Sequence, residues 1–211
     1  MSSKKGNVVT GAAGQGGSGG RATRTELLSE EEFRDCFGIP NEVSVQMLEG
    51  NVMSTVKSGD NSICFTKEQF NAGLRFPLPS LFKQFLHYTK IPPALIHPNV
   101  VRVLMGCSVL DMLFSLGLSL LEVIFIYSIK KAKNDIFSLA ASIPSLQLVT
   151  DLPDSTKGAA RGHVLVKGPW MGLMVHPDKQ FVPNQSLKVP GMNRLFPILS
   201  RLRVRSALLG G

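Results

Sequence analysis

Large apolar residues are sparse in the first part of the chain and recur at regular spacing from Thr25 onward. The opening stretch is rich in glycine, serine and alanine, so it cannot bury enough apolar surface to offset the entropy lost on ordering. We therefore expect residues 1–24 to form a disordered Gly/Ser-rich leader. The domain expected behind it spans residues 25–170, and a Pro/Gly-rich, basic tail follows over residues 171–211.

Two short helices are predicted directly after the leader. Ser29 is followed by three glutamates, a combination typical of a capped helix start, and Gly38 is typical of a helix end. Pro40 suits the first turn of a second short helix, which carries apolar residues up to Gly50.

The next segment combines a short extended piece with helices. Residues 63–65 favour an extended conformation, and Thr66 caps the turn that follows. Residues 79–88 place leucine and phenylalanine at helical spacing. A longer helix is predicted to begin at Pro98 and to end at Gly117. No continuous polar face interrupts its apolar residues, so we expect this helix to be largely enclosed.

A third helix is predicted from the capping box of Ser119 and Glu122. Its β-branched residues would also suit a strand. The cap at its start and the lysines after Ile129 favour a helix, because cations stabilise a helix C-terminus.

Short alternating runs at residues 146–149 and 163–166 flank a loop that contains proline and glycine, which predicts a β-hairpin. The expected fold class is therefore mainly α with a small β-hairpin (α+β). In this prediction a single compact helical domain lies between the disordered leader and a loose C-terminal tail.

Residues 112–129 form an apolar run of eighteen residues with one charge, Glu122, and basic residues follow at once. A single-pass membrane protein is therefore an alternative. Against it, the run contains a loop-and-cap pattern at its centre, and a glutamate near mid-bilayer costs about 2.5–3.5 kcal/mol. Two buried helices are the opposing explanation.

The net charge of +8 is concentrated after residue 74. A basic half attracts anionic partners without specifying which, so a nucleic-acid binder is a second alternative, and self-association is a further expected interaction. The candidate nucleic-acid contacts are Lys157, Arg161, Lys167, Trp170, Arg201, Arg203 and Arg205. Trp170 is the only tryptophan; it suits either a stacking platform for a base or a core position.

Sequence motifs for catalysis are missing. Gly14, Gly16 and Gly19 fit a dinucleotide-binding pattern, but neither the strand before it nor the helix after it is predicted. Cysteine and histidine lack metal-site spacing, which excludes a zinc knuckle. Asp111 and Glu122 could meet across two helices, although ordinary buried partners explain them as well. We therefore expect a protein that is not an enzyme and uses no cofactor, metal or small-molecule substrate.

Three widely spaced cysteines suggest no disulfide framework, and no apolar secretory signal opens the chain. Both features favour an intracellular location, in the nucleus or the cytoplasm, with a membrane location as the alternative.

Three segments resemble the plant gypsy-type transposon domain family of retroelement-derived proteins. They are Ala72–Leu78 (AGLRFPL), Ile96–Leu104 (IHPNVVRVL) and Leu152–Gly158 (LPDSTKG), and the likeness closes on Trp170. The resemblance covers residues 70–170, in the order and approximate spacing of the family.

The resemblance implies an origin in a long-terminal-repeat element and a coat-like or accessory role. It transfers no catalytic residue. Family members continue past Gly191 with a charged, often coiled-coil segment, whereas this chain ends at Gly211, so a truncated fragment is the expectation.

Overall fold

The computed structural model describes residues 28–48, 62–153 and 162–170. The predicted leader and the predicted tail lie outside these ranges. The described residues form a mixed α+β structure. Its helices are α1 (Glu30–Phe37), α2 (Lys67–Asn71), α3 (Ser80–Thr89), α4 (Pro98–Phe114) and α5 (Leu120–Ile126), with 3₁₀ turns η3 (Pro93–Leu95) and η4 (Pro144–Leu146). Its strands are β1 (Ser44–Leu48), β2 (Ser62–Thr66), β3 (Tyr127–Lys131), β4 (Phe137–Ala141) and β5 (His163–Lys167).

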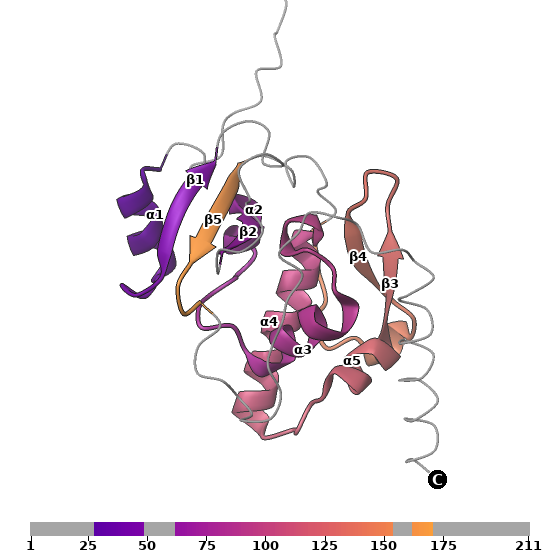
Figure 1. Cartoon of the computed structure of the whole chain (residues 1–211). Helices are drawn as coiled ribbons and strands as arrows, with labels where there is room; N and C mark the ends of the chain where they lie inside the picture. Colours follow the sequence, from indigo (N-terminus) through magenta and orange to yellow (C-terminus); the bar gives the residue numbers. More distant parts are fainter. Residues whose placement is uncertain (1–27, 49–61, 154–161, 171–211) are drawn as a thin grey trace, which may run out of the picture.

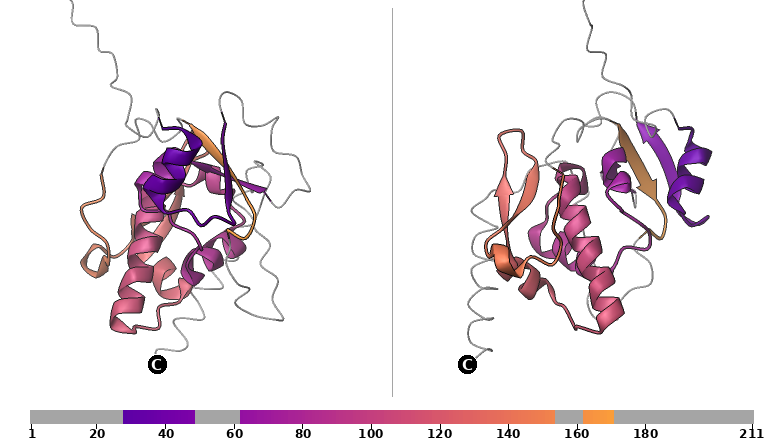
Figure 2. Two further views of the ribbon diagram at one scale, coloured as in Figure 1. Left: turned by 90° about the vertical axis from the view of Figure 1, so that its left-hand side faces the viewer. Right: turned by 180° about the vertical axis from the view of Figure 1, so that it is seen from behind.

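Two antiparallel sheets flank the central helices (Figure 1). The three-stranded sheet has the order β1-β5-β2, and β3 pairs with β4 in a separate hairpin. Helix α1 lies on one side of the three-stranded sheet, while α4 lies on its other side, between that sheet and the hairpin (Figures 1 and 2). The sequence of layers is therefore helix, sheet, helices and hairpin.

One hydrophobic cluster connects these layers. It begins with Phe33 of α1, continues through β2, α3 and α4, and ends at Trp170. Phe65 is central to it: its ring lies edge-on to Phe76 and to Trp170, with ring centroids 5.6 and 6.1 Å apart. Edge-to-face contacts of this kind add to the free energy gained from burial.

Several predicted elements are confirmed. Ser29 and Glu32 form the capping box of α1, and Gly38 ends the helix in the left-handed conformation. Residues 63–65 lie in β2, and α2 follows Thr66 directly. Helix α3 occupies the predicted range, and Pro98 is the first residue of α4.

The second short helix predicted from Pro40 is wrong, because residues 44–48 form β1. Val45 is buried in the large hydrophobic cluster, while Leu48 is buried in a smaller cluster with Cys64 and Leu165 on the opposite face of the sheet. The partner strand is β5, more than a hundred residues later, where Val45 is opposite Val166. A distant partner of this kind satisfies the backbone of β1 and overrides the local helical pattern.

The helix predicted from Ser119 is correct only as far as Ile126. The chain then turns into β3, whose β-branched and aromatic residues pair with β4. The three lysines that were expected to end this helix lie elsewhere. Lys130 and Lys131 are the last residues of β3, and Lys133 lies in the following turn.

The hairpin predicted from residues 146–149 and 163–166 is also wrong. Residues 163–166 do form a strand, but its neighbours are β1 and β2. Residues 144–146 form a 3₁₀ turn, and 147–149 follow it without regular structure. The hairpin of this fold is β3–β4.

Candidate functional site

Helix α4 is the central helix, and its two faces differ. Its inner face is formed by Val100, Val101, Val103, Leu104 and Cys107, all of which are buried in the core. Its start is capped by His97, whose Nδ1 accepts a hydrogen bond from the backbone N–H of Asn99 at 3.1 Å.

A loop covers the first half of the outer face of α4. The side-chain amide of Asn99 donates to the carbonyl oxygen of Pro153 at 3.0 Å. Further along the helix, Gly106 lies against Val149, so closely that a Cβ on Gly106 would be 2.8 Å from a methyl carbon of Val149. The Tyr127 hydroxyl bonds to the backbone of Val149 and fixes the loop at this point.

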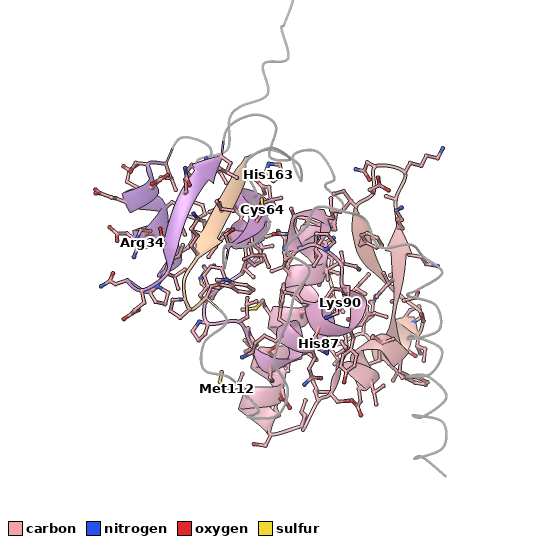
Figure 3. The ribbon with its side chains drawn as sticks, viewed as in Figure 1. Arg34, Cys64, His87, Lys90, Met112 and His163 are labelled. Carbon is pink, nitrogen blue, oxygen red and sulfur yellow. The ribbon has the colours of Figure 1, made fainter. Side chains whose placement is uncertain are left out.

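Among the described residues, none covers the second half of the outer face. Val109, Met112, Leu113 and Leu116 are 46, 74, 66 and 51% exposed, and Phe114, at the helix end, is 65% exposed. Together these five residues are called the α4 surface below. Figure 3 shows Met112 at the end of α4 that projects away from both sheets. The prediction that this helix is largely enclosed is therefore wrong for its last two turns.

The spacing of three of these residues explains why they share a face. Val109, Met112 and Leu113 follow the i, i+3, i+4 pattern, which places their side chains on one stripe of α4. Leu116 follows the helix, after the left-handed Ser115, and Phe114 lies on the other side of the last turn. Val100, Val103, Leu104 and Cys107 follow a similar pattern on the opposite stripe. Because both stripes are apolar, the sequence did not reveal which of them faces the core.

Hydrogen bonds hold the end of the α4 surface in place. Ser115 adopts the left-handed conformation and its N–H donates to the carbonyl of Asp111. The Asp111 carboxylate accepts from the backbone N–H of Leu118 at 2.8 Å. Ser119 and Glu122 form the predicted capping box of α5. The hypothesis that Asp111 and Glu122 meet is therefore wrong, since each carboxylate serves a different turn.

The described residues are electrically balanced. Their three ranges hold ten Lys and Arg residues and ten Asp and Glu residues, so the excess of +8 belongs entirely to the other segments of the chain. Between Arg102 and Lys130 the sequence contains no basic residue and no histidine. The α4 surface is therefore apolar and without nearby basic groups in the sequence.

The predicted nucleic-acid contacts are not gathered in the described part of the chain. Lys167 lies half-buried at the end of β5. Trp170 is fully buried, as the core alternative expected, and offers no exposed face for stacking. The other five residues lie outside the described ranges: Lys157, Arg161, Arg201, Arg203 and Arg205.

Residues that carry the family resemblance have structural roles. Arg75 donates to the carbonyls of Phe70 and Leu74, and its guanidinium lies 5.2 Å from the centre of the Phe37 ring. Arg102 donates to the Asn99 side chain at 2.9 Å, and Asn99 in turn holds Pro153. The second and third resembling segments are therefore joined by a direct hydrogen bond.

The buried titratable groups are poor candidates for catalysis. Burial raises the pKa of the Cys64 thiol to about 12 and that of Cys107 to about 11, so neither is a thiolate at neutral pH. Burial, and to a smaller extent the charge of Arg102, lowers the pKa of His97. Within residues 28–48, 62–153 and 162–170, no three metal-ligating side chains form a group that could hold an ion.

None of the helices in the described ranges has the length and apolar character needed to cross a bilayer. The candidate span of residues 112–129 is divided among the end of α4, a connecting turn, α5 and the start of β3.

Comparisons with protein-family models, with curated proteins and with solved structures found no match to this chain.

Proposed function

We propose that this chain is a non-catalytic interaction and assembly module that docks through the α4 surface. Residues 25–170 act in this proposal as one compact, mainly helical domain, supported by the single large hydrophobic cluster that runs from α1 to Trp170. The three resembling segments support a retroelement-derived protein fragment with a coat-like or accessory role in the nucleus or the cytoplasm. The module would need neither a cofactor nor a small-molecule substrate.

The observation that carries this proposal is the size of the α4 surface. Five large apolar side chains, each about half to three quarters exposed, present on the order of 500 Å² of apolar area. The largest apolar patch of an ordinary monomer is about 300–600 Å² and often functional. Leaving such an area in water is unfavourable, so its persistence in an otherwise well-packed fold indicates a docking role.

Substitution of two exposed residues, Met112→Ser and Leu113→Ser, tests this role in the full-length protein. Because both side chains are mostly in water, the melting temperature should stay close to that of the wild type. Assemblies of the tagged protein in cell extracts, measured as the size distribution in a sedimentation gradient, should become smaller.

The control variant is Leu146→Ser, which changes a half-exposed leucine of η4 that lies outside the α4 surface. It should leave both the melting temperature and the assembly size unchanged. A strong fall in melting temperature for the double variant would mean that these residues belong to the fold, and would reject the proposal.

Nucleic-acid binding is a second candidate function. It is favoured by the charge distribution, since the segments outside the described ranges carry thirteen basic and five acidic residues. In this hypothesis the contacts come from Lys157, Arg161, Arg201, Arg203 and Arg205, with Lys167 at the end of β5.

A further inference from the structure

We propose that the occupant of the α4 surface is a second copy of this chain, so that the protein forms a two-fold symmetric dimer in which two α4 helices pack against each other. This inference rests on the proposed docking role of the α4 surface and names its partner. Two identical helices related by a two-fold axis bring the same stripe to both sides of the contact, which is the usual arrangement of a homodimer.

The stripe has the geometry that such a contact needs. Val109, Met112 and Leu113 lie on the side of α4 opposite its buried residues, and Leu116 follows in the turn after the helix. A second helix can therefore approach without displacing the core. Rows of side chains spaced by three and four residues fit the grooves between equivalent rows on a facing helix. Met112 and Leu113 lie between Val109 and Leu116 along the chain, so they would lie close to the two-fold axis.

The extent of the surface also suits a dimer. A standard interface buries about 800 Å² on each partner, with an apolar centre and a polar rim. Without Phe114, which lies on the other side of the last turn, the α4 surface supplies on the order of 400 Å² of apolar area to this contact, which is enough for the centre. The turn after the helix is held by the bond from Leu118 to Asp111, so little conformational entropy is lost when the copies associate.

Charge favours a second copy over a lipid surface. Peripheral membrane segments combine exposed apolar residues with flanking Lys and Arg, which attract anionic headgroups. No basic residue or histidine occurs between Arg102 and Lys130, and the acidic residues of this stretch are Asp111 and Glu122. The described part of each copy has balanced charge, so any net repulsion between two copies comes from the other segments and not from the part that carries the α4 surface.

Sedimentation equilibrium of the full-length protein over a wide concentration range tests the dimer. The wild type should show a reversible monomer–dimer equilibrium. Leu113→Lys places a charge at the centre of the contact in both copies, so it should weaken self-association more than about tenfold. The matched control is Leu146→Lys, which adds the same charge on η4 and should leave the equilibrium unchanged.

Cysteine cross-linking tests the position of the axis. In a Cys36→Ser background, which removes the exposed native thiol, Met112→Cys should form a disulfide-linked dimer under mild oxidation. Lys133→Cys, in the turn between β3 and β4, should remain largely monomeric under the same conditions.

The outcomes separate this inference from the proposed function. A dimer that Leu113→Lys leaves intact, or a wild type that stays monomeric at every concentration, overturns the inference. The inference is also overturned if the monomer floats with anionic vesicles and Leu113→Lys abolishes this flotation, because the occupant of the α4 surface would then be lipid. A monomeric wild type whose cellular assemblies still shrink in the Met112→Ser, Leu113→Ser variant would overturn only self-association and would retain the docking role.

Discussion

At the scale of single residues, a few buried polar side chains connect segments that are far apart in the sequence. Gln69 of α2 is the clearest case. Its side-chain oxygen accepts from the backbone N–H of Thr66, while its nitrogen donates to the carbonyls of Pro93 and Ile96 at 2.6 and 2.7 Å. The buried Gln69 amide therefore stabilises the fold. Its removal would leave the Thr66 N–H and the carbonyls of Pro93 and Ile96 without this partner.

His97 is a second such residue, and it makes stability depend on pH. Its backbone N–H donates to Phe137 and its Nδ1 accepts from Asn99, while its side chain is only 8% exposed. Burial and the neighbouring Arg102 lower its pKa in the folded protein below 6.5, the value expected in the unfolded chain. The unfolded state therefore binds a proton more readily than the folded state in this range.

We predict that the free energy of unfolding falls as the pH is lowered through 6.5 toward the lower folded pKa of His97. The stabilisation should be fully present above 6.5, and the urea midpoint between about pH 7.5 and pH 5 measures its loss. His97→Asn keeps a capping side chain without a titrating group, so its loss should be smaller than that of the wild type.

Part of the pH dependence should remain in His97→Asn, because burial also lowers the pKa of His163. The lowered carboxyl pKa values of Glu32 and Glu122 act only below their ordinary value of 4.5, outside this window. An identical loss in wild type and His97→Asn would show that His97 does not contribute.

At the scale of elements, the position of β5 determines the three-stranded sheet. The strand pairs with β1 on one side and β2 on the other, and Val164 and Val166 are fully buried. Immediately after it, the chain passes close to the segment before β1. Gly168 has a φ of +96°, and a Cβ there would lie 2.5 Å from the carbonyl oxygen of Glu42.

We predict that Gly168→Ala destabilises the protein by about 2–4 kcal/mol, because a left-handed conformation costs about 1–2 kcal/mol for a residue with a Cβ and the backbone oxygen of Glu42 must also move. Denaturant unfolding measures the change. Gly117→Ala is the matched control: its φ is +67°, but no atom lies within 4 Å of the added carbon. It should cost only the conformational part, about 1–2 kcal/mol. Equal effects at the two glycines would contradict the proposed role of the close approach.

At the scale of the whole molecule, the excess positive charge and the exposed apolar residues of the α4 surface lie in different segments of the chain. The described residues are balanced in charge and carry the α4 surface, whereas the basic excess belongs to the other segments. Docking through α4 and binding of an anionic polymer would therefore use different parts of the chain. The two proposed functions can be tested independently.

For the nucleic-acid hypothesis, we predict that the triple substitution of Arg201, Arg203 and Arg205 by alanine weakens binding to a single-stranded oligonucleotide. The slope of log K against log salt should decrease in magnitude by about 2, since each phosphate contact contributes about 0.7. Fluorescence anisotropy over a range of salt concentrations measures both quantities.

A charge-matched control replaces Lys130, Lys131 and Lys133 of the β3–β4 hairpin by alanine. Lys131 already forms an ion pair with Asp135 at 2.7 Å, so this set is less available to phosphate. Equal effects of the two triple variants would indicate an unspecific response to net charge. Absence of salt-dependent binding in the wild type would reject nucleic-acid binding through these arginines.

The sequence by itself determined the local features of the fold. The capping box of Ser29 and Glu32, the cap of α5 at Ser119 and the periodicity of α3 depend on residues within a few positions of one another. These caps and this apolar spacing can therefore be recognised in the sequence without knowledge of distant partners. The burial of Trp170 was likewise one of the two predicted alternatives.

Only the tertiary structure decided which strands pair and which face of α4 is exposed. Residues 44–48 became a strand because β5 supplies their backbone partners, and Tyr127 begins a strand because β4 lies beside it. Within the described ranges the α4 surface is exposed because the loop that reaches Val149 and Pro153 covers only the first half of the outer face. Pairing and coverage depend on segments far along the chain, so two apolar stripes on one helix remain equivalent until the chain folds around one of them.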